Sequence, residues 1–464
     1  MVDGAGVSDM LGLDIPPIAQ DFPLKQDFPM KRLLRGRLLS FLRQPEGLND
    51  EGSYVYHADG GLLIEDGTIA GIGDYADIRA RAGAGVETVD HRPHLIMPGF
   101  IDPHIHFPQM QVVGSYAGNL LEWLNTYTFV EEQRFADAGH AARIAGRFFD
   151  ELVRYGTTTA VAYCSVHKAS ADAFFTESLR RNMRMVAGKV MMDRNAPSGL
   201  CDTPQSGYDD TKQVIADWHG RGRNHVAITP RFAITSTQEQ MEMAQALARE
   251  YPDLHIQTHL SENLDEVRFA AELYPRARDY TDIYERYGLL GRRSLFGHCI
   301  HLSDREADAM SESGSVAVFC PTSNLFLGSG LFGLKRLERR PKPVRAAVAT
   351  DIGGGTSYSM LRTLDEGYKV LQLQGERMTP LESFHRMTRG NAEALSLEDR
   401  IGTLAIGSDA DLVVLDAAAI PAMALKMEVV TTLAEELFLM QTMGDDRTIA
   451  ETYVAGAPAK SRLA

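Results

Sequence analysis

Two histidines lie two residues apart in the stretch PGFIDPHIHFPQ, residues 98–109. His104 and His106 belong to an apolar run typical of a β-strand, in which side chains at i and i+2 point to the same side. A Pro-Gly turn and Asp102 adjoin them. Two imidazoles beside a carboxylate are half of a metal site. Two surface histidines on an edge strand would produce the same triplet, so the pair alone leaves both interpretations open.

Other polar side chains end strand-like apolar runs further along the chain. They are Arg231 with Phe232, His259, His298 and Asp351. In a parallel barrel the carboxyl ends of all strands converge on one mouth, where catalytic groups collect. The metal ligands expected at this mouth are His104, His106, His259 and Asp351. Three imidazoles and one carboxylate suit zinc or another divalent metal with an open position for water.

Such a cluster predicts hydrolytic chemistry. A bound divalent ion lowers the pKa of water from about 15.7 to near 7, which yields hydroxide at neutral pH. Asp351 would ligate the ion and accept the proton of the water. Glu262, three residues after His259 at a strand-to-helix turn, is a candidate proton shuttle, a role worth roughly 10²–10⁴ in rate. His298 would either ligate the ion or steady the attacking oxygen.

Each of these residues has a structural alternative when it is taken alone. His259 could be a hydrogen-bonded core histidine, and Asp351 a turn residue before glycines. Glu262 could cap the next helix, because acidic residues favour first turns. Arg231 could belong to a structural ion pair, and Phe232 could be packing. The joint placement at strand ends favours a metal-dependent hydrolase.

Eight apolar runs alternate with amphipathic helices in the middle of the chain, a pattern typical of a parallel α/β fold. They are the run through His106, 157–165, 184–192, 225–232, 255–260, 294–300, 315–321 and 345–351. Eight β/α units over about 300 residues predict a TIM-like (β/α)₈ barrel. An open doubly wound sheet is the alternative, although no phosphate-binding glycine motif follows any strand. One helix is expected over 236–251, with Ser236 and Glu239 at capping-box spacing.

Short β-like runs separated by glycine-rich turns lie at both ends of the chain. Gly60-Gly61 and Asp66-Gly67 have the composition of hairpin turns. Because the two ends flank the barrel pattern, we expect them to pair into one small β-sandwich domain. The predicted organisation is a loosely ordered N-terminal tail at residues 1–26, the first part of the sandwich at 27–95, the barrel at 96–400 and the second part of the sandwich at 401–464.

The composition excludes several classes of partner. The formal charge is −15, whereas a nucleic-acid groove needs a basic field. No segment resembles a signal peptide or offers roughly 18 uninterrupted apolar residues for a membrane span. The four cysteines contain no C-x-x-C pair, which fits a reducing cytoplasm better than a disulfide framework. We therefore expect a cytoplasmic protein that binds neither nucleic acid nor membranes.

Six stretches carry a resemblance to a known family: PGFIDPHIHFPQ, GKVMMDRNAP, TPRFAITS, THLSENLDEV, FCPTSNLFLGSGLFGLK and TDIGGGTSYSMLRT. From about residue 30 to the end, the chain resembles the guanine deaminases of the amidohydrolase superfamily. The resemblance implies zinc-dependent hydrolysis of guanine to xanthine and ammonia, usually by a homodimer; iron or manganese could fill the same ligands. It assigns the metal ligands to His104, His106, His259 and Asp351. It assigns proton shuttling to Glu262, an additional catalytic role to His298, and purine contacts to Gln109, Arg231 and Phe232.

The chemistry of the side chains agrees with this assignment. Arg231 has hydrogen-bond donors only, which match a carbonyl oxygen such as guanine O6 and would face the amino group of adenine. Gln109 has a donor and an acceptor, which match a ring N–H and a neighbouring acceptor. A site built on such pairing rejects the wrong analogue by about 10⁴–10⁵. Two alternatives stay open: a related amidohydrolase acting on another aminated or halogenated heteroaromatic ring, and a non-catalytic assembly protein.

Overall fold

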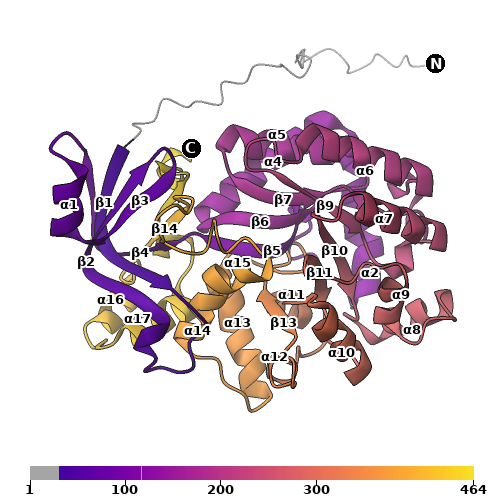
Figure 1. Cartoon of the computed structure of the whole chain (residues 1–464). Helices are drawn as coiled ribbons and strands as arrows, with labels where there is room; N and C mark the ends of the chain where they lie inside the picture. The colour runs from indigo at the N-terminus through magenta and orange to yellow at the C-terminus, as the bar shows by residue number, and fades with distance from the viewer. Residues whose placement is uncertain (1–30, 117, 464) are drawn as a thin grey trace, which may run out of the picture.

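The computed structural model describes residues 31–116 and 118–463 of the 464-residue chain. These residues form a parallel barrel and a smaller mixed sheet, which lie side by side (Figure 1). The tail expected at residues 1–26 lies outside the described part of the chain. The domain limits at 27–95, 96–400 and 401–464 stay a prediction.

Parallel strands form the wall of the barrel. In order around it they are β5 (Phe100–His106), β6 (Thr157–Tyr163), β7 (Arg184–Gly188), β9 (His225–Pro230), β10 (His255–Leu260), β11 (Ser294–His298), β12 (Val316–Phe319) and β13 (Arg345–Val348), with the short β8 (Val190–Met191) paired to β9. Hydrogen bonds from Asp351 N to His104 O (3.0 Å) and from His106 N to Ile352 O (2.5 Å) join the segment after β13 back to β5. The expected (β/α)₈ barrel is confirmed.

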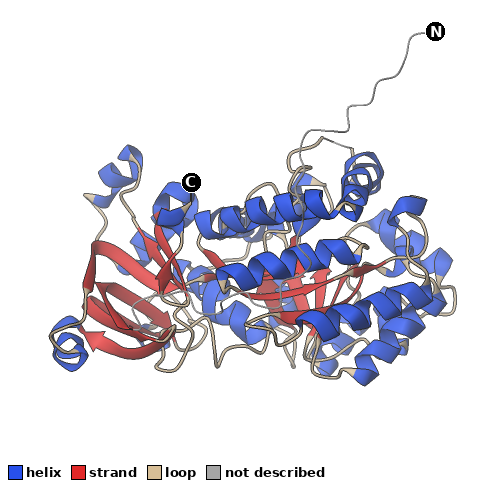
Figure 2. Ribbon diagram, turned by 90° about the horizontal axis from the view of Figure 1, so that it is seen from above, coloured by secondary structure: helices blue, strands red, loops and turns tan. Residues whose placement is uncertain are grey.

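Helices surround the barrel strands (Figure 2). The longer ones are α4 (Ala138–Arg154), α5 (Lys168–Arg181), α6 (Pro204–Trp218), α7 (Gln238–Glu250), α8 (Leu264–Leu273), α9 (Tyr280–Arg286), α10 (Asp304–Ser313) and α13 (Met360–Leu373). Shorter ones are α2 (Leu120–Trp123), α3 (Phe129–Gln133), α11 (Pro321–Phe326), α12 (Leu334–Glu338), α14 (Pro380–His385) and α15 (Asn391–Ala394). A hydrophobic cluster that includes Ile101, Val161 and Leu295 lies apart from the larger cluster between strands and helices. The barrel interior is therefore filled by apolar side chains, which pack beneath the mouth.

The helix expected over 236–251 is α7, and its cap lies one residue later than predicted. Thr237, not Ser236, is the N-cap, and its side chain accepts from Gln240 N. The cause is a long-range contact: Asp193 accepts hydrogen bonds from Thr237 N (2.8 Å) and Thr237 Oγ1 (2.5 Å). This contact holds Thr237 so that its side-chain oxygen faces the first turn of α7. The spacing of residues in the sequence shows which residues could cap the helix, but not which of them a distant residue such as Asp193 holds in place.

Both ends of the chain contribute to the second sheet, as predicted. It is one seven-stranded sheet in the order β16-β15-β14-β4-β1-β2-β3. Its strands are β1 (Lys31–Phe41), β2 (Tyr54–Glu65), β3 (Thr68–Asp74), β4 (Thr88–Pro98), β14 (Leu412–Leu415), β15 (Ile449–Val454) and β16 (Ala457–Pro458), and its helices are α1 (Tyr75–Ala82), α16 (Pro421–Met427) and α17 (Leu433–Met443). The antiparallel pairing of β4 with β14 joins the two ends.

One of the two predicted hairpin turns is wrong. Asp66-Gly67 does turn β2 into β3, with φ of 49° and 77°. Gly60-Gly61 instead lies inside β2, paired on both sides with β1 and β3. The glycines are needed for close approach, because a Cβ on Gly60 would lie 2.4 Å from Leu38 Cγ. Glycine in a strand marks a crowded contact here, not a turn.

Asn391 binds the backbone of the first and last barrel strands. Its Nδ2 donates to Ile101 O and Val348 O, both at 2.8 Å, and its Oδ1 accepts from Val348 N at 3.0 Å. Asn391→Ala leaves three buried backbone groups unpaired, so we expect the free energy of unfolding to fall by roughly 3–5 kcal/mol. Urea unfolding measures this loss. Asn125→Ala, at an exposed site, is the control and should stay within about 0.5 kcal/mol of the parent; equal stability of both variants would contradict the assignment.

No helix in residues 31–116 and 118–463 is long and apolar enough to cross a membrane. The four cysteines are all free thiols.

Candidate metal centre and substrate pocket

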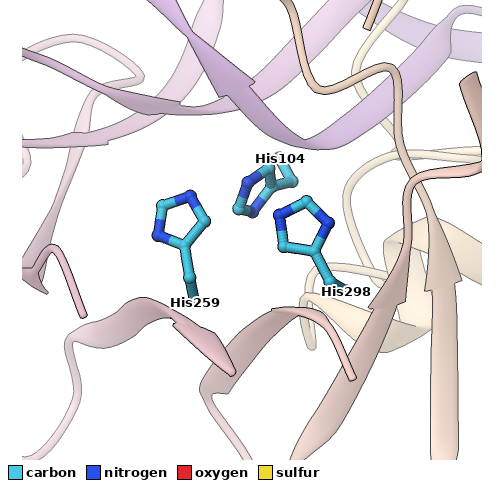
Figure 3. Close-up of side chains that lie close together, drawn as sticks. All are labelled: His104, His259 and His298. Carbon is cyan, nitrogen blue, oxygen red and sulfur yellow. The ribbon is translucent and has the colours of Figure 1, made fainter. Parts of the chain in front are cut away.

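The predicted ligands come together at the carboxyl ends of the barrel strands. His104 and His106 end β5, His259 lies near the end of β10, and Asp351 follows β13. The imidazoles of His104, His259 and His298 point toward one another across the mouth (Figure 3). Nε2 of His106 lies 3.1 Å from Nε2 of His259. Asp351 Oδ1 lies 3.3 Å from His104 Nε2 and 3.4 Å from His106 Nε2.

These donor atoms fit a divalent cation. His104 Nε2 is buried and has no hydrogen-bond partner, and two imidazole nitrogens at 3.1 Å need a shared proton or a shared cation between them. Two groups of residues each have potential ligand atoms that lie within 4.8 Å of one another. One group is His104, His106 and Asp351, and the other is His104, His259 and His298. Three nitrogens and one oxygen around one point are a donor set for zinc or a similar ion.

Neighbouring groups orient the imidazoles. His259 Nδ1 lies 2.7 Å from Arg231 O, a carbonyl that can only accept, so Nδ1 carries the proton and Nε2 is free to ligate. His298 Nδ1 lies 2.9 Å from Asn324 Oδ1, which leaves its Nε2 facing the mouth in the same way. Gly297 gives His104 its space, because a Cβ there would lie 2.5 Å from His104 Cε1.

Asp102, which the sequence places beside the histidine pair, is in none of the groups of potential metal ligands found among the described residues. Its Oδ1 accepts from Thr350 N (3.2 Å) and His104 N (3.3 Å), and its Oδ2 accepts from Thr350 Oγ1. These hydrogen bonds join β5 to the segment that carries Asp351.

The backbone is strained at two residues of the site. Asp351 and His298 have φ of 52° and 71°, a region that costs non-glycine residues about 1 kcal/mol or more.

Glu262 faces the same mouth and does not cap the following helix. Asn263 is the N-cap of α8, in a capping box with Glu266. The Glu262 side chain accepts from Ser329 Oγ at 3.0 Å, and its Oε2 lies 3.4 Å from His298 Nε2. Burial raises the pKa of Glu262 to about 7. A carboxyl group with this pKa can give and take a proton near neutral pH.

Asp351 has the opposite electrostatic environment. Burial opposes its ionisation, but the imidazoles of His104, His298 and His259 lower the pKa of Asp351 to about 2. Burial lowers the pKa of His104, His106 and His259, which keeps these rings neutral. Neutral imidazoles and an ionised carboxylate are the forms that ligate metals.

The raised pKa of Glu262 predicts a pH-dependent cost in stability. The folded protein holds this proton with a pKa of about 7, against 4.5 for an ordinary glutamate. Stability therefore falls as pH rises through this window, and above pH 7 the ionised group costs roughly 3 kcal/mol. We expect Glu262→Gln to raise the free energy of unfolding at pH 8 by about this amount and to change it little at pH 4.5. Urea unfolding at the two pH values tests this; an equal gain at both would contradict it.

The predicted purine contacts lie beside the cluster. Gln109 follows β5, Arg231 and Phe232 follow β9, and all three are buried. Arg231 is a member of a buried ion pair, since its Nη1 lies 2.6 Å from Glu132 Oε2. One pocket is lined both by residues of the predicted metal cluster and by the predicted purine contacts. Its lining residues are His106, Gln109, Leu120, Trp123, Leu124, Arg231, Phe232, His259, Glu262, His298, Leu327 and Asp351, with Gly354.

Comparisons with known proteins identify the family. The model for the Amidohydrolase family matches residues 95–458. The chain belongs to the amidohydrolase family. Among curated relatives, this amidohydrolase is 46% identical over 426 residues to a guanine deaminase of Escherichia coli (strain K12), covering 92% of this chain and 97% of that protein.

Solved structures share the fold of this amidohydrolase across almost their whole length. E. coli guanine deaminase superposes with a TM-score of 0.88 at 44% sequence identity, covering 93% of this chain and 99% of that one. Guanine deaminase from C. acetobutylicum, with guanine bound in its active site, has a TM-score of 0.82 at 28% identity and covers 92% and 99%.

Several residues of the amidohydrolase site carried no recognisable signal in the sequence. Trp123 and Leu124 line the pocket from a short helix and a π-helical turn (Leu124–Thr128). Cys320 lies with His298 and Asp351 in a third group of potential ligands. Burial raises the pKa of the Cys320 thiol well above its usual range, and its Sγ donates to Val318 O. It is therefore held as a neutral thiol, a poor metal ligand.

Proposed function

We propose that this amidohydrolase is a guanine deaminase, which hydrolyses guanine to xanthine and ammonia with one zinc ion per chain. The observation that carries the proposal is the composition of the pocket. Side chains able to read a purine, Gln109 and Arg231, line the same space as His259, Glu262 and Asp351. A ring held against the first pair would therefore present its reacting carbon to the second group.

The ring is held by complementary hydrogen bonds. Arg231 donates to the carbonyl O6, where adenine would present an amino group instead. Gln109 pairs with a ring N–H and a neighbouring acceptor. Phe232 packs beside the site, with its ring 6.1 Å from that of His259 and edge-on to it. Binding through a carbonyl oxygen and a ring N–H orients C2, which carries the amino group, toward the carboxylates.

His104, His106, His259 and Asp351 would hold the metal ion. When bound, a zinc ion lowers the pKa of water to about 7 and polarises the reacting centre. The donor set suits zinc, although iron or manganese takes similar ligands.

The two carboxyl groups then move the protons. Glu262, protonated at its raised pKa, gives its proton to N3, while Asp351 accepts one from the water whose oxygen bonds to C2. His298 Nε2 lies 3.4 Å from Glu262 and 3.7 Å from Asp351, where it steadies that oxygen. The proton on Asp351 passes to the amino group, which leaves as ammonia when the C2–N bond breaks. The hydroxyl proton returns to Glu262 as the C2 carbonyl forms, which restores both groups.

Substrate profiling tests the proposal. The purified protein is incubated with guanine, adenine, cytosine and 8-oxoguanine, and the ultraviolet spectra are followed. We expect xanthine from guanine and a rate with adenine at least about 10⁴-fold lower, because adenine places donor against donor. Absence of xanthine would overturn the proposal, and conversion of another ring alone would assign a different amidohydrolase activity.

We also propose a homodimer in the cytoplasm, as the family resemblance implies. The four free thiols support a reducing compartment. Sedimentation equilibrium at several concentrations tests the dimer: a mass near 51.2 kDa, that of one chain, at all concentrations would overturn it.

A further inference from the structure

A buried glutamate lies behind the two residues proposed to read the ring. Glu132 is on α3 and is 1% exposed. Its Oε1 accepts from Gln109 Nε2 at 2.8 Å, and its Oε2 accepts from Arg231 Nη1 at 2.6 Å. The backbone beneath it is also held, because Ser165 Oγ donates to Glu132 O at 3.1 Å. The Glu132 carboxylate therefore binds both Gln109 and Arg231, the two residues proposed to contact the purine.

The contacts of Gln109 leave its amide a single orientation. A carboxylate only accepts, so the amide nitrogen must face Glu132. On the other side, Gly353 N donates to Gln109 Oε1 at 3.1 Å. One N–H and one lone pair of the amide remain for a ligand. Without Glu132 the amide would lose one of the two partners that fix its orientation and would keep only Gly353 N.

Glu132 also balances the charge of Arg231. The guanidinium is permanently positive and only 3% exposed, with the Phe129 ring 5.3 Å from its centre. Paired with Glu132, it remains a strong donor but adds no net charge to the pocket. Such a pocket favours a neutral ring with a carbonyl oxygen. An unpaired buried cation would instead attract an anion.

We propose that Glu132 is a positioning residue that sets specificity: by binding Gln109 and Arg231 together, it fixes their donor pattern and makes the pocket select a neutral oxopurine over an anionic one. This inference rests on the proposed function, since it assumes that these two residues read the purine. It assigns Glu132 no contact with the substrate and no step in the reaction.

Two substitutions separate charge from geometry. Glu132→Gln removes the charge with little change of shape, and Glu132→Asp keeps the charge on a shorter side chain. The matched control is Glu131→Gln, because Glu131 adjoins Glu132 on α3 but pairs with Arg134 (2.7 Å) and His140 (3.2 Å) instead. Each metal-loaded protein is assayed for kcat and KM with guanine and for inhibition by urate, an oxopurine that is an anion at neutral pH.

For Glu132→Gln we expect the KM for guanine to rise and the inhibition constant of urate to fall, each by about tenfold. Glu132→Asp should raise the KM while leaving the urate constant near that of the parent. Glu131→Gln should change neither. A general loosening of the pocket would weaken both ligands together, so parallel changes in the two constants would overturn the proposal, as would unchanged constants in Glu132→Gln.

Calorimetric titration with urate keeps this test independent of turnover. If the parent makes no xanthine, the proposed function fails, yet the titration still reports whether Glu132→Gln binds the anion more tightly. Tighter binding supports the charge-balancing role, and equal or weaker binding overturns it. Near-ultraviolet circular dichroism checks that the variants keep the packing of the parent.

Discussion

His259→Ala should lose the bound metal and nearly all turnover. The imidazole is buried, its Nδ1 is fixed by Arg231 O, and its Nε2 lies 3.1 Å from His106 Nε2. Removing one of three nitrogen donors weakens the site and leaves the remaining groups without their shared cation. Loss of metal assistance costs several kcal/mol of transition-state stabilisation, which corresponds to a fall in kcat/KM of roughly 10³ or more. Elemental analysis and the guanine assay measure the two losses.

His255→Ala is the matched control for this substitution. His255 lies on the same strand, β10, and is also buried, but its Nε2 binds Leu395 O at 2.8 Å, away from the cluster. The control should keep about one metal ion per chain and most of the activity, with some loss of stability from the unpaired carbonyl. Metal loss in both variants would mean that any damage to β10 empties the site. Normal turnover in His259→Ala would mean that the site is misplaced.

The strand-end residues were predictable because two simple regularities act on them. Apolar runs of six to nine residues separated by helices define a barrel, and the carboxyl ends of its strands share one mouth. His259 and Asp351 lie 92 residues apart in the sequence, yet these regularities alone bring them to one edge. Predicting that these residues meet requires only knowing which strand each of them ends, and no knowledge of individual side-chain contacts.

Glu132 was not predictable for the opposite reason. It stands beside Glu131 in a polar stretch, and nothing local distinguishes the two carboxylates. Their difference is tertiary: one faces Arg231, 99 residues away, and the other faces Arg134 in the next turn. The same holds for Gly60-Gly61, whose close contacts with other elements are invisible to turn composition. Such roles are set by tertiary packing between elements, which the local sequence does not encode.

Glu262→Gln should lower kcat by roughly 10²–10⁴ and leave the metal in place. The amide has nearly the shape of the carboxyl group and can still bind Ser329 and His298, so the substrate pocket keeps its form. It cannot release a proton to N3 or recover one from the hydroxyl at C2. The loss should therefore fall on kcat rather than on KM, because the missing interaction belongs to the transition state.

Unfolding cannot explain such a loss, because the same substitution removes a buried charge. Glu262→Gln is expected to be more stable than the parent at pH 8, where the parent holds an ionised carboxylate against its raised pKa. Glu306→Gln alters another buried glutamate, the capping-box residue of α10, and should keep its kcat while losing some stability. If the Glu262 variant is both more stable and nearly inactive, the Glu262 carboxyl group serves proton transfer although it lowers the stability of the folded protein. A variant with normal kcat would assign the proton transfers to another residue, and His298 is the nearest one able to carry them.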